Sequence, residues 1–361
     1  MNLFAFTRYG PLGASSRLRL MQFRTALLSA GVGVHVRPLL DDDYLRGKYA
    51  GKVTWSRVIR SYFARLFDAW SISTSTSSDV IWIEKELWPW APAWLEHAAF
   101  RSMPVVLDYD DAIFHNYDLA RSAIVRALLG RKIDRLMARA ALVTAGNAYL
   151  ADRARQAGAK WVEVLPTVVD LDRYPPPRPR ATASSADTVV IGWIGSPATV
   201  GYLQQLAEPL RRLASENRVR LHVIGGGAVR LPGVEVVSVP WTESSEVDSI
   251  SQCDIGVMPL RDSPWERGKC GYKLIQYMAC GLPVVASPVG VNTSIVCEGA
   301  SGFLAGNPGD WFSSLQVLAR DPSMRARFGA AGRARVEAEY CVQVAAPRLA
   351  QWLHTLNKRA N

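Results

Sequence analysis

Residues 267–291 read RGKCGYKLIQYMACGLPVVASPVGV. The helical spacing of its apolar residues and its good helix formers predict a helix from Tyr272 to Cys280. Gly281 ends that helix, and the apolar, β-branched run Pro283–Ala286 predicts a short buried strand before the next turn. A helix, a glycine stop, a buried strand and a glycine turn form one unit of a Rossmann-like fold.

Glycines and basic residues gather at the start of this helix. Gly268 and Gly271 allow close approach of the backbone, and three cations accompany them: Arg267, Lys269 and Lys273. A helix start also offers unpaired N–H groups and the positive end of the helix dipole. The pattern predicts a receptor for a di-anion such as a pyrophosphate. The alternative is an ordinary Rossmann-like helix and strand with solvated lysines.

The stretch resembles the nucleotide-sugar-binding segment of the family-4 (group 1) retaining glycosyltransferases, which have the GT-B fold. The matching run is MACGLPVVAS, at Met278–Ser287. In that family two Glu residues, with seven residues between them, lead into this run. Here Gly268 stands at the first of those positions and Gln276 at the second. The resemblance implies two Rossmann-like domains that face each other across a cleft, with a C-terminal helix that crosses back to the first domain.

The resemblance also implies a donor site in the second half of the chain. The turn after the first strand of that half faces the diphosphate, and the loop near Trp241 faces the base. The basic residues usual shortly after that turn are absent here, so the cations near the predicted helix must supply the positive charge. The expected donor-binding residues are Gly195, Ser196, Trp241, Arg267, Lys269, Gly271, Tyr272, Lys273 and Gln276.

The chain begins with a unit of the same kind. Asn2–Thr7 predicts a strand, residues 9–16 a glycine-rich turn, and a helix and a second strand follow. This order starts a doubly wound sheet, whose ligands sit at the C-terminal ends of its strands. Residues at such ends are candidates for contact with the acceptor or the cleft: Gly10, Gly13 and Glu84.

Acidic residues crowd at the end of another predicted strand, Pro104–Leu107. Carboxylates this close can raise the pKa of one another and make one a proton carrier. The candidate catalytic residues are Asp110, Asp111 and His115. By the resemblance, Asp111 matches the Asp of a VHD-like strand end, and Asp110 stands where the family often has His. The alternative is that these acids cap the next helix or pair with nearby arginines.

The length of 361 residues favours two domains over one. Residues 165–187 hold five prolines and end in small polar residues, which is typical of a linker between domains. We therefore expect an acceptor-binding domain at 1–170, completed by a helix at 342–361. We expect a linker at 171–187 and a nucleotide-sugar-binding domain at 188–341.

The positive charge of the chain is uneven. Residues 1–180 hold 25 Lys and Arg against 17 Asp and Glu, a net charge of +8 out of the total of +10. This favours an anionic partner such as a lipid headgroup or a phosphate, and since no nucleic-acid module is visible we expect no nucleic acid. Residues 53–70 predict an amphipathic helix, with Arg57, Arg60 and Arg65 off or beside its apolar stripe. It either lies on an anionic membrane surface or packs on its own sheet with snorkelling arginines.

Several classes of site and location are excluded by composition. No apolar run is long enough to span a membrane, and the N-terminus reads as a strand rather than a leader, so we expect a cytoplasmic protein, peripheral at most on the inner membrane face. The five cysteines form no CxxC pair, which argues against a disulfide framework or a structural zinc site. We expect no metal and no cofactor other than the nucleotide sugar itself.

The predicted function is that of a retaining, hexosyltransferase-type glycosyltransferase, which moves a sugar from a nucleotide diphosphate to a glycan or a lipid-linked acceptor. Two alternatives stay open. One is a nucleotide-sugar epimerase or a phosphorylase of the same fold. The other is a non-catalytic nucleotide-binding protein, which the two missing Glu residues suggest. An NAD enzyme is disfavoured because the chain has no strand-linked GxGxxG followed by an acid.

Overall fold

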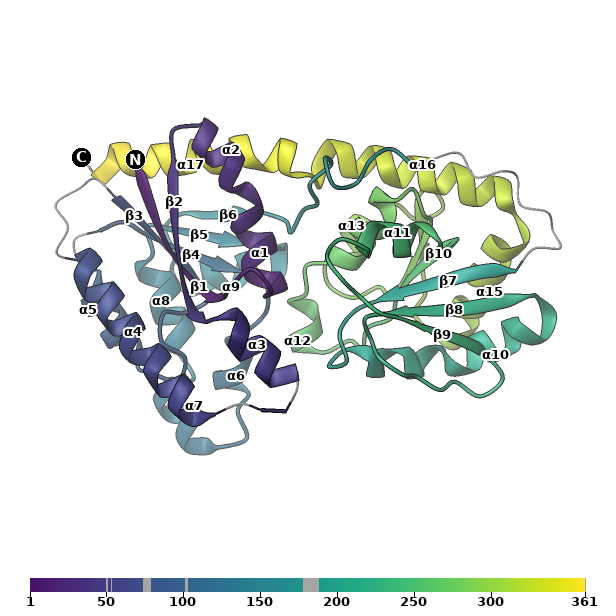
Figure 1. The fold of residues 1–361 in the computed structure, drawn as a ribbon, viewed down its shortest axis with the longest axis horizontal. Coiled ribbons are helices and arrows are strands. Elements are labelled where there is room, and N and C mark those ends of the chain that lie inside the picture. Colours follow the sequence, from purple (N-terminus) through teal and green to yellow (C-terminus); the bar gives the residue numbers. More distant parts are fainter. Residues whose placement is uncertain (50, 53, 74–78, 101–102, 178–187, 361) are drawn as a thin grey trace. The chain divides into compact units, whose positions relative to one another are not determined.

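The computed structural model describes residues 1–49, 51–52, 54–73, 79–100, 103–177 and 188–360 (Figure 1). The described chain forms two compact units. The first unit comprises Met1–Thr167, Gly268–Cys270 and Val342–Asn361, and the second comprises Val168–Arg267 and Gly271–Cys341. Residues 168–170, predicted in the first domain, and residues 171–177, predicted as linker, thus belong to the second unit, and the rest of the predicted linker, 178–187, lies outside the described residues.

The first unit is built on a six-stranded sheet in the order β2-β1-β3-β4-β5-β6. All neighbouring strands are parallel, and the inner strands β4 and β5 are buried along nearly their whole length, as expected of a sheet that helices cover on both faces. The largest core side chains include Phe6 and Trp82, both fully buried. The strands are β1 (Asn2–Tyr9), β2 (Gly33–Leu40), β3 (Asp79–Glu84), β4 (Val105–Tyr109), β5 (Leu142–Ala145) and β6 (Val162–Val164).

Short helices and one long helix follow these strands in the first unit. They are α1 (Ala14–Arg19), the 3₁₀ helix η1 (Met21–Phe23), α2 (Arg24–Ser29), α3 (Asp42–Tyr49), α4 (Trp55–Ser73), α5 (Ala93–Ala99), α6 (His115–Asp118), α7 (Ala123–Leu129), α8 (Lys132–Arg139) and α9 (Ala148–Gln156). The last helix of the chain, α17 (Val342–Ala360), also belongs to this unit and follows the whole second unit in sequence. Its His354 ring nitrogen Nε2 lies 2.9 Å from the carbonyl oxygen of Ala30, at the end of α2. The predicted return of the C-terminal helix is confirmed.

The second unit has a parallel sheet of the order β12-β11-β10-β7-β8-β9. Its strands are β7 (Val189–Ile194), β8 (Val219–Ile224), β9 (Glu235–Val239), β10 (Ile255–Met258), β11 (Val284–Ala286) and β12 (Gly302–Leu304). Its helices are the 3₁₀ helix η2 (Val200–Leu206), α10 (Ala207–Glu216), α11 (Glu246–Ser251), α12 (Pro264–Arg267), α13 (Tyr272–Ala279), α14 (Asn292–Ile295), α15 (Pro308–Arg320) and α16 (Pro322–Glu339). The predicted helix and strand in residues 267–291 are confirmed as α13 and β11, with Gly281 at φ +70° between them.

Each sheet has one place where the strand order reverses direction. In the first unit β1 lies between β2 and β3, and in the second β7 lies between β8 and β10. Loops that leave neighbouring strands in opposite directions open a crevice there, at the carboxyl ends of the strands. The residues after Tyr9 and Glu84, and those after Ile194 and Met258, are therefore the first places to look for sites. Two parallel α/β sheets confirm the predicted pair of Rossmann-like domains.

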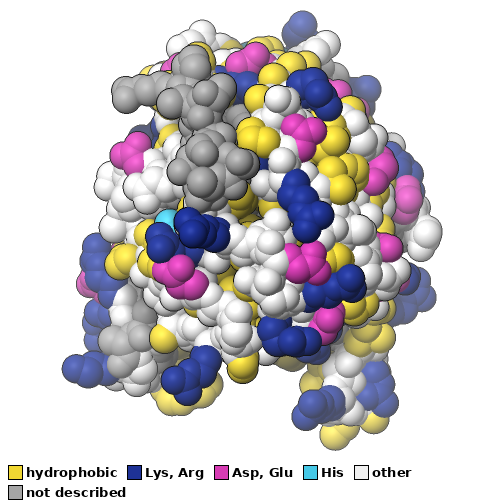
Figure 2. Space-filling model, turned by 90° about the vertical axis from the view of Figure 1, so that its right-hand side faces the viewer, with side chains coloured by type: hydrophobic (Ala, Val, Ile, Leu, Met, Phe, Trp, Pro, Cys, Tyr) yellow, Lys and Arg dark blue, Asp and Glu magenta, His cyan; other side chains and the backbone are white. Residues whose placement is uncertain are grey.

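Two properties of the surface bear on partners. Figure 2 shows Lys and Arg side chains spread over the face that it draws, with Asp and Glu among them, rather than one patch of a single sign. Within the described ranges, no helix combines the length and the apolar character that a membrane span requires.

Candidate functional site

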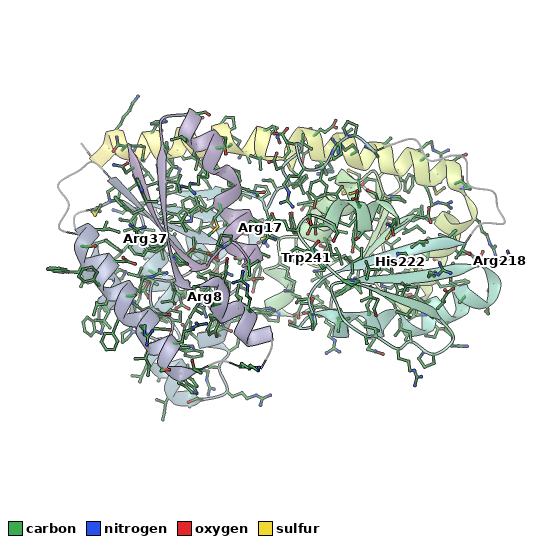
Figure 3. All side chains as sticks on the ribbon, viewed as in Figure 1. Arg8, Arg17, Arg37, Arg218, His222 and Trp241 are labelled. Atoms are coloured by element: carbon green, nitrogen blue, oxygen red, sulfur yellow. The ribbon has the colours of Figure 1, made fainter. Side chains whose placement is uncertain are left out.

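In the second unit, glycines let three loops meet at the carboxyl end of β7. The amide of Gly195 donates to the carbonyl oxygen of Ile224, at 2.9 Å. A Cβ on Gly225, whose φ is +76°, would lie 2.7 Å from the Gly195 oxygen and 2.9 Å from Cβ of Trp241. Only a glycine fits there. The structure thus brings Gly195 and Trp241, two predicted donor-binding residues, to one edge of the sheet, where Figure 3 labels Trp241.

A buried hydrogen-bonded chain runs from this tryptophan to the helix α13. The Trp241 indole N–H donates to Glu246 at 2.8 Å, and the Tyr174 hydroxyl donates to the other oxygen of Glu246 at 2.7 Å. The Gln276 amide in turn donates to the Tyr174 hydroxyl at 3.1 Å. Glu246 and Gln276 are both buried. Burial, aided by Tyr272 and Glu246, raises the pKa of Tyr174 well above its usual value, so the hydroxyl keeps its proton and serves as a donor.

Replacing Gln276 by Glu is expected to destabilise the folded chain by about 2–4 kcal/mol near pH 7. A second carboxylate would then share Tyr174 with buried Glu246, and each charge would oppose the other. Burial and repulsion would raise the folded pKa of the new group above its unfolded value, so the variant should approach the parent stability below about pH 4 and lose it as pH rises. Chemical denaturation at several pH values measures this. Gln351→Glu, at an exposed position of α17, is the control, and an equal effect of both changes would contradict the prediction.

The start of α13 is shaped by Gly271. This residue has φ +65°, and a Cβ on it would lie 2.3 Å from Ile295 Cδ1. Tyr272, the first residue of α13, is half buried, and Lys273 follows it. The ammonium group of Lys273 lies 5.6 Å from the ring centre of Trp193, a residue of β7. Lys273 is therefore held near the same edge as Gly195 and Ser196, whose carbonyl oxygen accepts from the amide of Thr199 in a tight turn.

The other two cations of the predicted site lie elsewhere. The Arg267 guanidinium is half exposed and bonds Asp262 at 2.7 Å. Lys269 belongs to the first unit, where its carbonyl oxygen accepts from the Asn147 amide at 2.9 Å and its ammonium group lies 3.9 Å from Asp111. Of the three cations, the second unit thus holds Lys273 beside β7, and the first unit holds Lys269 beside a candidate catalytic acid.

In the first unit, Glu84 holds the glycine-rich turn after β1. Its buried carboxylate accepts from the backbone amide of Arg8 at 3.0 Å and from the Ser16 hydroxyl at 2.6 Å. Gly10 and Gly13 complete the turn, because a Cβ on Gly10 would lie 2.5 Å from Asp42 Oδ1 and one on Gly13 would lie 2.3 Å from Tyr9 Cβ. These three predicted residues come together, with Glu84 as the internal brace of the turn.

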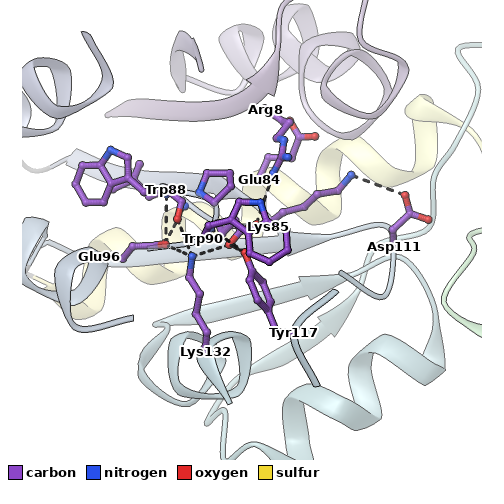
Figure 4. Close-up of polar contacts among 12 residues, drawn as sticks. Arg8, Glu84, Lys85, Trp88, Trp90, Glu96, Asp111, Tyr117 and Lys132 are labelled. Atoms are coloured by element: carbon purple, nitrogen blue, oxygen red, sulfur yellow. Dashed lines mark hydrogen bonds and ion pairs between the residues drawn. The ribbon is translucent and has the colours of Figure 1, made fainter. Parts of the chain in front are cut away.

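The next residue, Lys85, has an unusual backbone. Its φ is +68°, a left-handed conformation that costs a non-glycine residue roughly 1–2 kcal/mol. The conformation directs its ammonium group to Asp110 Oδ1 at 3.0 Å and toward Asp111 Oδ2 at 3.8 Å, as the contact in Figure 4 shows for Asp111. Burial acts to lower the pKa of Lys85, but the two carboxylates raise it above its ordinary value. Lys85 therefore stays a cation.

Asp110 and Asp111 differ in how open they are. Asp110 is 12% exposed, takes a hydrogen bond from the Ser15 hydroxyl and pairs with Lys85. Burial acts to raise its pKa, but Lys85 and Arg19 lower it below the usual range. Asp111 is 31% exposed and lies between the ammonium groups of Lys85 and Lys269. Of the two, Asp111 is the carboxylate that a bound molecule can reach.

His115 is fixed by partners on both ring nitrogens. Its Nδ1 lies 2.8 Å from Asp118 and its Nε2 lies 2.9 Å from the Tyr149 hydroxyl. Its side chain is 9% exposed. These contacts tie α6 to α9 and leave the ring no free nitrogen for a substrate. In the part of the chain that the structure describes, no group of three His, Cys, Asp or Glu side chains is arranged to hold a metal ion.

Two buried charge clusters under this site have no counterpart in the sequence patterns. Arg19 binds both oxygens of Asp108, at 2.6 and 2.9 Å, and donates to the carbonyl oxygen of Leu165 at 2.6 Å. A second cluster follows β3, where the Lys132 ammonium group lies 2.6 Å from Glu86 and 2.9 Å from Glu96 (Figure 4). Burial raises the pKa of Glu96, although Lys132 opposes that rise. Both clusters fix the strand ends from which the candidate residues project.

The chain has known relatives in sequence. Residues 188–321 match the family model described as Glycosyl transferases group 1. A D-inositol 3-phosphate glycosyltransferase of Xylanimonas cellulosilytica is 29% identical over 223 residues, which are 54% of this chain and 52% of that protein. The chain thus spans about half the length of this curated relative.

Solved structures resemble the chain over nearly its full length. A sucrose-phosphate synthase from Thermosynechococcus elongatus has a TM-score of 0.71 at 16% identity, over 99% of each chain. The Anabaena protein HepE, solved in complex with UDP-glucose, has a TM-score of 0.67 at 16% identity, over 98% of this chain and 100% of that one. The chain therefore has a two-domain GT-B fold, and its residues 188–321 match the model of the group 1 glycosyl transferases.

Proposed function

We propose that the protein transfers a sugar from a nucleotide diphosphate sugar to a glycan or a lipid-linked acceptor, with retention of the anomeric configuration, in the cytoplasm. The observation that carries the proposal is the group 1 family match, because it covers the edge of β7 and the start of α13. There Gly195, Trp241 and Lys273 gather in one unit, and a buried network joins Trp241 to Gln276. The UDP-glucose complex of HepE supports a nucleotide sugar as the donor.

In this reaction the second unit stabilises the leaving group. Negative charge grows on the diphosphate as the bond to the sugar breaks, and the N–H groups at the start of α13 together with Lys273 offset that charge. The acceptor attacks from the face that the diphosphate leaves, so no protein nucleophile is needed. The first unit handles the acceptor hydroxyl, with Asp111 as the base and with Lys85 and Asp110 as positioning residues.

A second candidate function is nucleotide binding without transfer. The neutral side chain of Gln276, buried at the place of a family Glu, and Gly268 at the place of the other favour it. Such a protein would bind the same nucleotides as the enzyme and release no free nucleotide diphosphate from the donor. An epimerase or phosphorylase would turn over the donor without a separate sugar acceptor.

The substitution Lys273→Ala is expected to weaken the binding of nucleotide diphosphates about ten- to a hundredfold, the effect of losing one charged hydrogen bond to a phosphate. Thermal shift with UDP, GDP, ADP and dTDP identifies the base, since a ligand at 100 times its dissociation constant stabilises by about 2.7 kcal/mol. Titration of the best nucleotide then compares the parent with Lys273→Ala. Lys358→Ala, on the exposed end of α17, is the control. Unchanged affinity in Lys273→Ala would remove this lysine from the donor site.

A further inference from the structure

The helix α4 has one side that packs on the sheet of its unit. That side contains Ala69 and Ile72, which are buried, and the half-buried Val58 and Tyr62. Arg65 lies among them at 2% exposure, donates to the carbonyl oxygens of Thr7 at 2.7 Å and Arg37 at 2.9 Å, and stacks on the Phe6 ring. This side of α4 therefore forms its contact with the sheet, and Arg65 is part of that packing rather than of the protein surface.

The adjoining side of α4 is apolar as well, and it is exposed. Its large residues span the whole helix, and at 3.6 residues per turn they fall within about a third of its circumference. Ring-bearing side chains extend from the outer side of this helix in Figure 3. The exposed residues are Trp55 (81%), Ile59 (55%), Phe63 (69%), Leu66 (53%), Phe67 (64%) and Trp70 (63%).

This apolar stripe is unusual for a surface helix. A helix on the surface of a globular protein places polar residues on its outer side, and a helix that is apolar on two sides belongs in an interior or at an interface. Scattered apolar residues need no explanation, but six on one helix form a contiguous surface of the kind that binds a partner or a membrane. The stripe is therefore suited to burial in an apolar partner surface or in a membrane.

The charge around the stripe selects the environment. Residues 44–70 hold six Lys and Arg, of which Arg65 is buried in the packed side, and one acid, Asp68. Arg57 and Arg60 are exposed on α4, with Arg60 beside the stripe and Arg57 3.8 Å from Asp43. Exposed apolar residues recur one turn apart on α7, at Ile124 (71%) and Leu128 (69%), again beside arginines, Arg121 and Arg126. A second copy of the chain would bring these cations against one another, whereas an anionic surface would pair with them.

We propose that the exposed face of α4 docks on the surface of an anionic lipid bilayer, with the stripe in the boundary between headgroups and acyl chains and with Arg57 and Arg60 among the headgroup phosphates. Tryptophan suits this boundary because its large apolar ring carries one polar N–H group, and phenylalanine adds apolar surface that the acyl chains can cover. Basic residues on the flank add attraction to anionic lipids. The proposal rests on α4 and goes beyond the sugar transfer proposed above, so it stands or falls without it.

Sedimentation of the full chain with vesicles tests the docking. Vesicles of phosphatidylglycerol and phosphatidylcholine should carry the parent protein down, and vesicles of phosphatidylcholine alone should do so far less. Ile59→Ser/Phe63→Ser should lower the partition coefficient by at least roughly tenfold, because two apolar side chains that enter the bilayer in the bound state are lost. Arg57→Gln and Arg60→Gln should each lower it by roughly fivefold. Leu28→Ser/Val317→Ser, at exposed apolar residues of α2 and α15, is the matched control and should bind as the parent does.

A probe on the helix reports the contact directly. An environment-sensitive dye on Phe63→Cys should shift to the blue when anionic vesicles are added, and the same dye on Leu28→Cys should not. Labelled parent protein is the blank, because four native thiols are buried and Cys297 is half buried. Equal binding of the parent and Ile59→Ser/Phe63→Ser, or no shift at Phe63→Cys, would overturn the proposal. A parent protein that binds no vesicles but self-associates, with the self-association abolished by this double substitution, would also overturn the proposal. The exposed face of α4 would then be an interface with a second copy of the chain.

Discussion

Replacing Asp111 by Asn is expected to slow sugar transfer by about 10²- to 10⁴-fold, with little change in melting temperature or in donor affinity. The acceptor hydroxyl loses its proton as it attacks, and an amide cannot take that proton. Asp111 suits this role because it is 31% exposed, whereas Asp110 beside it is enclosed by Lys85 and Ser15. The measurement is the rate of nucleotide diphosphate release at saturating donor, once the thermal-shift panel has identified the nucleotide.

Asp110→Asn separates catalysis from structure at the same strand end. Its carboxylate has a folded pKa below the unfolded one, so its pairing with Lys85 stabilises the fold above about pH 4 and is lost as pH falls through the folded value. This variant should therefore lose both stability and activity at neutral pH. Its free energy of unfolding should also fall less than that of the parent when the pH is lowered. Asp152→Asn, at an exposed position of α9, should change neither stability nor activity. If Asp111→Asn transfers sugar at the parent rate, the carboxylate has no part in the chemistry.

Replacing Asp108 by Asn is expected to destabilise the chain by about 3–5 kcal/mol, because it leaves the guanidinium of Arg19 buried without its counter-ion. Both side chains are at most 1% exposed, and the pair is bidentate. The Thr144 hydroxyl also donates to Asp108, so the loss reaches from α1 through β4 to β5. Chemical denaturation followed by circular dichroism measures the effect.

An exposed pair provides the control for that prediction. Asp43 and Arg46 lie 2.8 Å apart at 60% and 66% exposure, and Asp43→Asn should cost less than about 1 kcal/mol. The double variant Arg19→Met/Asp108→Leu should be more stable than Asp108→Asn, since no unpaired charge remains buried. A loss of the same size in Asp43→Asn, or no recovery in the double variant, would show that the penalty does not come from a stranded charge.

The sequence was most informative where local patterns decide the structure. The helix and strand of residues 267–291 follow from apolar spacing, and the turns at Gly10, Gly195 and Gly271 follow from residues that alone tolerate close approach or positive φ. The charge clusters could not be predicted, because Arg19 and Asp108 are 89 residues apart and nothing local pairs them. Nor does local composition explain why Tyr174, beside a run of prolines, is buried against Glu246.

The helix α4 shows a limit of periodicity. The helix itself is confirmed, at Trp55–Ser73 rather than 53–70. We expected Arg65 off or beside the apolar stripe, and it lies instead in the packed side, where backbone carbonyl oxygens satisfy its guanidinium. Apolar residues occur on two sides of this helix, and spacing alone does not tell which side meets the sheet.

The last helix has a consequence for how the chain is made. A ribosome releases residues in order, and domains generally fold as they emerge. The first unit, however, includes Gly268–Cys270 from the middle of the second unit and α17, which follows the second unit in sequence. All strands of the second unit are therefore synthesised before α17, which the first unit needs to be complete. The first unit begins first in the sequence and yet completes its fold last.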